Sequence, residues 1–157
     1  MEEKSKNHFL RKATLKDLLT IVEMLADDVL GQTREEVSDP LDQRYITAFE
    51  AIDQDPNQDL VLLVNDQDEV LGTLQLTYLQ YLNLKGSKRA LIESVRIHST
   101  QRRKGLGEQM FQLAIERAKE NGATIIQLTS DKKRTEALRF YEKLGFTASH
   151  EGFKLKI

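Results

Sequence analysis

The spacing of apolar residues divides the chain into short stretches with either a helical or a strand-like repeat. Four stretches have apolar residues three and four positions apart, which predicts amphipathic helices over 15–30, from about 40 to before Pro56, 106–121 and 134–144. Five short stretches are continuously apolar or alternate with a period of two, which predicts strands over 8–13, 60–64, 70–79, 89–97 and 125–128. Residues 146–150 and 153–157 predict a terminal hairpin around Glu151-Gly152.

The predicted element order is β-α-α-β-β-β-α-β-α-β-β. Three consecutive strands without an intervening helix argue against a doubly wound parallel sheet, so we predict an α/β fold with a mixed β-sheet flanked by helices. Thr14 is predicted to cap the first helix with Asp17 three residues on, and Gly31 to end it. No linker or repeat interrupts the pattern, so residues 1–157 are expected to form a single domain.

Composition and charge exclude several classes of protein. The chain has 23 basic and 25 acidic residues, which argues against a nucleic-acid-coating protein. It has no cysteine, which excludes disulfides, thiolate metal sites and a cysteine nucleophile. The N-terminal sequence has no apolar signal region and no window approaches the length of a membrane span, so we expect a cytoplasmic protein without membrane contact. His8, His98 and His150 have no metal-ligand spacing, and no metal is expected.

The segment from Arg102 to Gly107, Arg-Arg-Lys-Gly-Leu-Gly, stands between a predicted strand and a predicted helix. Glycines at a helix start let the backbone approach a ligand, and the unpaired amides there attract anions. Three preceding cations would neutralise a phosphate or pyrophosphate. The alternative is an ordinary turn in a solvated basic loop. No Walker sequence is present, and a dinucleotide fingerprint would need glycine where Met110 stands.

Two blocks of this sequence resemble the Gcn5-related N-acetyltransferase (GNAT) superfamily. Arg102-x-x-Gly105-x-Gly107 is similar to its R/Q-x-x-G-x-G/A signature, and residues 92–97 resemble its fourth strand. Residues 137–146 are similar to a second signature, A-x-x-x-Y-x-x-x-G-F. The resemblance is strongest over residues 90–147. It implies an enzyme that transfers the acyl group of a CoA thioester, usually acetyl-CoA, directly to an amine.

The resemblance also implies roles for particular residues. The pyrophosphate of acetyl-CoA is expected on the backbone amides of residues 103–108, with the side chains of Arg102 and Arg103 also on phosphate. The strand edge at residues 95–97 is expected to pair with the pantetheine arm. The full set expected to bind the cofactor is Val95, Arg96, Ile97, Arg102, Arg103, Lys104, Gly105, Leu106, Gly107 and Glu108. Arg134 stands where the family often has an asparagine that meets the pantetheine arm.

Two side chains are candidates for proton transfer. Tyr141 matches the family tyrosine that protonates the departing thiolate, and a phenol is protonated at neutral pH. The alternative for Tyr141 is a core position on its helix. Glu93 is predicted on one strand face with Leu91, Val95 and Ile97, where a carboxylate among apolar neighbours is suited to take a proton from an ammonium. The alternatives for Glu93 are an ion pair with Arg89 or Arg96, and a water chain as the base.

The amine acceptor is expected to be a small molecule or a lysine side chain. Six acidic residues against one basic residue lie between Asp27 and Asp42, which would attract a cationic amine, although a solvated connection is an equal alternative. Lys85, Lys88 and Arg89 would instead favour a carboxylate-bearing acceptor. A second hypothesis is a CoA-binding regulatory module without turnover. The family resemblance is also compatible with a homodimer through the C-terminal strands.

Overall fold

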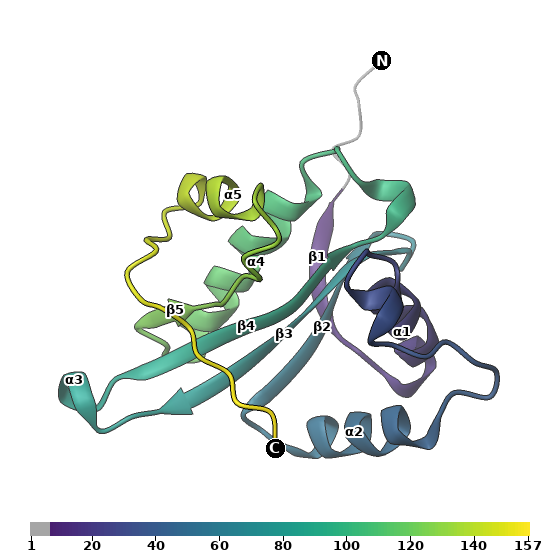
Figure 1. The fold of residues 1–157 in the computed structure, drawn as a ribbon, viewed down its shortest axis with the longest axis horizontal. Helices are drawn as coiled ribbons and strands as arrows, with labels where there is room; N and C mark the ends of the chain where they lie inside the picture. Colours follow the sequence, from purple (N-terminus) through teal and green to yellow (C-terminus); the bar gives the residue numbers. More distant parts are fainter. Residues whose placement is uncertain (1–6) are drawn as a thin grey trace. The chain divides into compact units, whose positions relative to one another are not determined.

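The computed structural model describes residues 7–157 and contains a five-stranded sheet in the order β1-β2-β3-β4-β5 (Figure 1). The strands are β1 (His8–Lys12), β2 (Gln58–Asn65), β3 (Val70–Gln80), β4 (Lys88–Ile97) and β5 (Ile125–Gln127). β4 and β5 pair in parallel, and the other neighbours are antiparallel, which confirms the predicted mixed sheet. The chain divides into two compact units, one up to Gln127 and one of Leu128–Ile157, which are described separately.

The helices are α1 (Leu18–Ala26), α2 (Gln43–Gln54), α3 (Asn83–Gly86), α4 (Leu106–Glu120) and α5 (Ala137–Lys143). Each helix that the apolar spacing predicts is present. The additional α3 is a tight turn, because Leu84 and Lys85 inside it have φ values of 51° and 60°.

The first predicted helix ends earlier than its apolar spacing indicates. α1 stops at Ala26 instead of residue 30, and the chain folds back so that Gly31 lies against Leu25. A Cβ at Gly31 would lie 2.0 Å from the Leu25 carbonyl oxygen, so only glycine fits there. The Asp28 carboxylate accepts the Gly31 amide hydrogen and competes with the helical ladder. Gly31 is therefore a site of close packing and not the helix cap.

Both faces of the sheet are buried. Leu60, Leu62 and Val64 of β2 pack with α1 and α2, in a core that also contains Ala13, Leu18, Ile21, Val22, Met24 and Phe49. The opposite face meets α4, because a Cβ at Gly72 would lie 3.1 Å from the Met110 sulfur. The α4 side chains buried there are Leu106, Met110, Phe111, Ala114 and Ala118. Burial on two faces explains why the sequence of β2 is apolar without alternation.

An ion pair fixes the C-terminal half of α4 to β2. The Arg117 guanidinium donates from Nε and Nη2 to the Asp59 carboxylate at 2.5 and 3.0 Å, and Asp59 is only 8% exposed. Burial raises the pKa of Tyr78 to about 12, and the negative charge of Asp59 adds to this shift. The phenol therefore stays neutral beside the pair at every physiological pH. A buried carboxylate is tolerated here because its charge is paired.

The predicted C-terminal hairpin is wrong. No strand forms over residues 144–157, although Phe153-Lys-Leu-Lys-Ile157 alternates apolar and basic residues. Phe153 and Leu155 are 93% and 88% exposed. A period of two specifies a strand only where one of its faces is covered, and these side chains are not covered.

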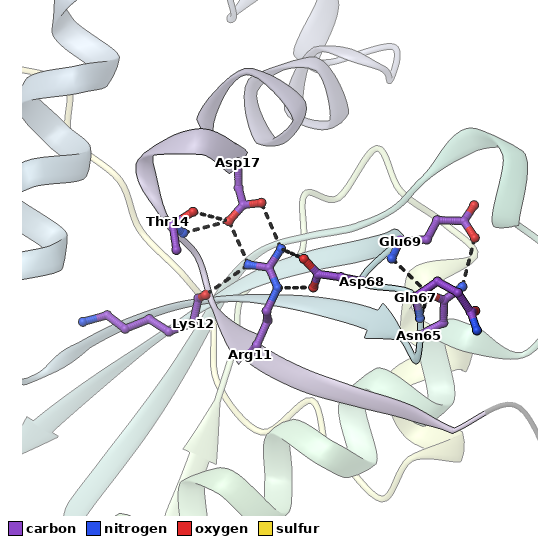
Figure 2. A network of polar contacts seen from close by, with 8 residues as sticks. All are labelled: Arg11, Lys12, Thr14, Asp17, Asn65, Gln67, Asp68 and Glu69. Atoms are coloured by element: carbon purple, nitrogen blue, oxygen red, sulfur yellow. Dashed lines mark hydrogen bonds and ion pairs between the residues drawn. The ribbon is translucent and has the colours of Figure 1, made fainter.

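A network of polar contacts joins β1, the start of α1 and the turn between β2 and β3 (Figure 2). Arg11 donates to both oxygens of Asp17, at 2.8 and 3.0 Å, and to both oxygens of Asp68, at 2.6 and 3.3 Å. Asp17 also accepts the backbone amide and the hydroxyl of Thr14, so the predicted cap forms at the 3-10 turn Leu15–Asp17 that leads into α1. The Arg11 side chain, followed by the Thr14 amide, lowers the pKa of Asp17 from 3.8 to about 2.

The depressed pKa of Asp17 predicts a loss of stability in acid. A carboxylate whose pKa is lower in the folded state stabilises the fold above its unfolded pKa and loses that contribution as pH falls through the folded pKa. We expect Asp17→Asn to lower the free energy of unfolding by about 1 kcal/mol at pH 7, since the pair is partly solvated. The deficit should shrink below pH 3.8 and vanish near pH 2. Urea denaturation of both proteins across this range measures it.

Asp66→Asn in the exposed β2–β3 turn is the control, since no hydrogen bond or ion pair joins its side chain to the described residues. A deficit for Asp17→Asn that stays constant down to pH 2 would contradict the assignment.

Candidate active site

An extra residue in β4 reshapes the strand next to the glycine loop. Opposite β3, Gln75 pairs with Glu93 and Thr73 pairs with Arg96, so three steps along β4 face two along β3. Ser94 has a φ of 57° at this bulge. Bulges are common beside active sites because they redirect the side chains that follow.

The bulge changes which side chains share a face with Glu93. Cross-strand partners lie on the same side of a sheet, so Glu93 lies with Leu91 and Arg96 on the side of α1 and α2. Ile97 pairs with Gly72 and lies on the opposite side, towards α4. The prediction that Ile97 shares a face with Glu93 is therefore wrong, because the alternation that it assumes is interrupted by the bulge.

The environment predicted for Glu93 also differs. Its side chain is exposed, and no ion pair joins it to another side chain of the described residues. The expected partner Arg96 is instead paired with Asp28 at 3.1 Å, and both side chains are less than a fifth exposed. Glu93 is thus a solvent-accessible carboxylate at the open edge of the sheet, and the apolar burial predicted for it is not found.

The second half of β4 has an open edge. β5 pairs with β4 only over Arg89–Leu91, so within the unit that ends at Gln127 no strand pairs with residues 92–97 on that side. The Val95 carbonyl accepts a hydrogen bond from Arg96 Nη1 at 2.9 Å, and the Ile97 carbonyl accepts one from Arg102 Nε at 3.4 Å. An edge of this kind presents backbone groups to which an extended ligand can bind in the manner of a strand.

α4 begins at Leu106, after a loop that leads from the end of β4 at Ile97 through the 3-10 turn Ser99–Gln101. Gly105 precedes the helix with φ 75° and ψ 7°, the left-handed conformation that glycine adopts without cost, and Arg103 has a φ of 62°. Gly105, at the N-cap position, has no side chain that could cap the helix. The first amides of a 15-residue helix therefore point outward without intrahelical partners, which favours a bound anion.

The side chains around this loop have different environments. Leu106 is buried and offers only its backbone, whereas Gly107 and Glu108 are half-buried in the first turn. Lys104 donates to Gln101 Oε1 at 3.0 Å, and Arg103 is exposed. An exposed arginine beside open amides is suited to contact a phosphate.

Arg102 is already engaged by the end of α1. Its Nη2 donates to the Asp27 carbonyl at 3.0 Å and to the Asp27 carboxylate at 3.2 Å. The neighbouring Asp28–Arg96 pair makes a second connection between the end of α1 and β4. The sequence does not indicate these pairs, since 68 or more residues separate the partners.

Most carboxylates of the acidic segment between Asp27 and Asp42 contact other residues of this chain. Asp27 and Asp28 pair with arginines, Asp42 and Glu36 contact Arg44, and Glu35 accepts from the Tyr45 hydroxyl. These contacts offset only part of the acidic charge that the sequence suggests as an attractant for cationic amines, because Glu36 and Asp42 share Arg44 and the Tyr45 hydroxyl is neutral. The engaged carboxylates favour the alternative of a solvated connection.

Tyr141 lies on α5, in the second unit. Its ring contacts Phe140 and Phe146 edge to face, with centroids 5.4 and 6.0 Å apart, and its side chain is half-buried. Arg134 lies before α5, and its backbone carbonyl accepts the Ala137 amide. The aromatic contacts fix the ring, which is a requirement for a proton donor of defined geometry.

Two classes of feature are absent from residues 7–157. No group of three or more His, Cys, Asp or Glu side chains could hold a metal ion. No helix in this range is long and apolar enough to cross a membrane.

Comparisons with known proteins agree on one family. The acetyltransferase (GNAT) family model matches residues 22–146. An aminoalkylphosphonate N-acetyltransferase of Salmonella typhimurium is 30% identical over 148 residues, which cover 92% of this chain and 88% of that protein. A crystal structure described as a transcriptional regulator from Bacillus halodurans is 51% identical with a TM-score of 0.91, covering 96% of this chain and 100% of that chain.

A more distant structure supports the fold alone. A GNAT family acetyltransferase of Staphylococcus aureus is 18% identical with a TM-score of 0.74, and the match covers 96% of this chain and 98% of that chain. The family match includes both the glycine loop before α4 and the α5 segment with Tyr141. The chain therefore belongs to the acetyltransferase (GNAT) family.

Proposed function

We propose that this protein transfers an acetyl group from acetyl-CoA to the primary amine of a small molecule. The observation that carries the proposal is the left-handed Gly105 at the start of α4, in the loop that follows the open edge of β4. The extended backbone edge and the anion site follow each other along the chain. Together they match a ligand in which a pyrophosphate is followed by an amide-containing arm. The relative that acts by name on aminoalkylphosphonates supports a small amine as the acceptor.

The loop before α4 fits the pyrophosphate. A Cβ built at Gly105 would meet no atom within 4 Å, so the space in front of the helix is open. The amides of residues 103–108 would hold the phosphate oxygens, with Arg103 and Lys104 adding charge. Arg102 would have to break its ion pair with Asp27 to contact the phosphate, so we expect it to contribute less to phosphate binding than Arg103 and Lys104.

The edge of β4 fits the pantetheine arm. Backbone groups of Val95, Arg96 and Ile97 would pair with its amides, and the thioester would then lie beside the bulge and Glu93. The cofactor supplies an activated acyl carbon that an amine can attack directly. Main-chain atoms do most of this binding, so substitutions of the three side chains should have small effects on affinity.

Glu93 and Tyr141 are the proposed proton-transfer groups. Glu93 would accept a proton from the acceptor ammonium, since its carboxylate is exposed and unpaired by any described side chain. Tyr141 would donate its hydroxyl proton to the leaving thiolate. This assignment requires both units to act as one domain over residues 1–157, which the continuous family match over residues 22–146 supports.

A second candidate function is a CoA-binding regulatory module without turnover. The 51% identical relative described as a transcriptional regulator favours this candidate. Both functions need the Gly105 loop, whereas only the enzyme needs Glu93 and Tyr141. Variants of these two residues therefore separate the candidates.

Acetyl-CoA and CoA should raise the melting temperature, and NAD should not. A ligand that binds only the folded state at about 100 times its Kd adds about 2.7 kcal/mol of stability. We expect Gly105→Val to abolish this shift, because its side chain fills the open space before α4. Thermal unfolding with each ligand at millimolar concentration measures the effect.

Gly86→Val is the matched control, since Gly86 also has a left-handed φ of 76° with no atom within 4 Å of a built Cβ. Both variants should lose about 1–2 kcal/mol from backbone strain, but Gly86→Val should keep the ligand shift. Retention of the shift by Gly105→Val would overturn the pyrophosphate assignment.

Tyr141→Phe should keep acetyl-CoA affinity and lower turnover about 10²–10⁴-fold, because it removes only the proton of the proposed acid. Release of free thiol under saturating substrates measures turnover. Tyr45→Phe, which removes a hydroxyl from a tyrosine on α2 of the other unit, should leave the rate unchanged. Normal turnover of Tyr141→Phe would exclude the tyrosine from the mechanism.

Glu93→Gln should also lower turnover about 10²–10⁴-fold and remove the acidic limb of the pH–rate profile. Glu50→Gln, an exposed glutamate on α2, is the control for loss of one surface charge. If Glu93→Gln turns over at the normal rate with its acidic limb in place, another group or a water chain is the base.

A further inference from the structure

Arg89 on β4 differs from the other half-buried arginines of its unit. Arg11, Arg96 and Arg117 each contact an aspartate at 3.1 Å or closer. No carboxylate of the described residues pairs with Arg89, although its side chain is half-buried. A partly desolvated guanidinium is costly to keep without an anion, so its surroundings indicate what it binds.

The groups around Arg89 are neutral. Its guanidinium lies over the Tyr81 ring, 4.4 Å from the centroid. Its Nη1 and Nη2 reach Gln127 Oε1 and Asn83 Oδ1, both at 3.3 Å, and its Nε is buried with no hydrogen-bond partner among the described residues. The ring and two amides hold the guanidinium in place but leave its charge uncompensated, which suits an acid group that can present two oxygens to it.

Arg89 shares a face of the sheet with Glu93. The cross-strand pairs Leu79–Arg89, Thr77–Leu91 and Gln75–Glu93 all precede the bulge, so these residues lie on the same side. Four steps along a strand separate the two Cα atoms by about 13 Å. The cation Arg89 and the anion Glu93 therefore lie on one face of β4, in the regular part of the strand before the bulge.

The strip beside this line is polar and uncharged. Gln58 Oε1 accepts hydrogen bonds from Gln75 Nε2 at 2.9 Å and from Thr77 Oγ1 at 2.8 Å, and all three side chains are half-buried. These side chains occupy the same face as Glu93. They can hydrogen-bond a polar chain that joins the two charged ends of a ligand.

We propose that Arg89 binds an acid group of the acetyl acceptor, so that the acceptor is a primary amine with a carboxylate or phosphonate at its other end. This inference rests on the proposed function, with the amine of the acceptor at Glu93. Lys88 is not an alternative, because it donates to the Asn121 carbonyl at 2.6 Å and lies over the Tyr78 ring on the opposite face. An acid group bound by Arg89 would fix one end of the acceptor. The amine at the other end would then lie along β4, towards Glu93.

The first test compares acceptors on the wild-type protein. Pentylamine, 5-aminopentanoate and 3-aminopropylphosphonate are assayed for free-thiol release with acetyl-CoA. We expect at least about 10-fold higher kcat/KM for one or both acid-bearing amines than for pentylamine, as for a hydrogen-bonded ion pair. The comparison of carboxylate with phosphonate identifies which acid Arg89 takes.

The second test compares Arg89→Gln with Lys88→Gln, which removes the neighbouring charge from the opposite face. Arg89→Gln should raise KM for the preferred acid-bearing amine at least about 10-fold and leave acetyl-CoA affinity and the rate with pentylamine unchanged. Lys88→Gln should change none of these values. The unfolding temperature of both variants checks that each is folded.

The possible failures are distinguishable. Equal kcat/KM for charged and neutral amines in the wild type overturns the role of Arg89 and leaves the proposed function intact. Equal losses with all amines in Arg89→Gln also overturn it, because they indicate a structural role. If the wild type binds acetyl-CoA but acetylates none of the amines, the inference for Arg89 fails. If it does not bind acetyl-CoA, the proposed function fails.

Discussion

The short pairing between β4 and β5 determines how the rest of the site is arranged. Three residues of β5 hold β4 at Arg89–Leu91, and beyond them the strand continues with one side unpaired. Backbone N–H and C=O groups in the interior of a sheet form hydrogen bonds to the neighbouring strands. Here, on one side of β4, no strand of the same unit pairs with them. The ion pair of Asp59 and Arg117 fixes α4 near its far end, and Gly105 before its start is exposed.

Two arginine–aspartate pairs connect this open region to the end of α1. Arg96 with Asp28 is largely buried and is a fixed part of the fold, whereas Arg102 with Asp27 is about half-exposed. Exposed pairs contribute little to stability and exchange partners easily. A negatively charged ligand at the helix start would therefore disturb the second pair far more readily than the first.

Sequence patterns predicted the fold class and the order of elements through α5, because the apolar periods of helices and strands are local properties. They also located the glycine loop, since Gly105 adopts a conformation that few other residues tolerate. They could not predict the bulge at Ser94, because serine carries no signal for a left-handed backbone. The alternation around Phe153 predicted a strand that does not form, since alternation cannot reveal whether anything covers a strand.

The bulge decides on which side of the sheet the end of β4 presents its side chains. If the same residues 93–97 alternated regularly, Arg96 and Ile97 would exchange sides. A guanidinium would then enter the apolar layer against α4, and an isoleucine would replace it beside Asp28. The extra residue of the bulge therefore keeps both layers in order, and the backbone at Ser94 matters more than the solvent exposure of its side chain suggests.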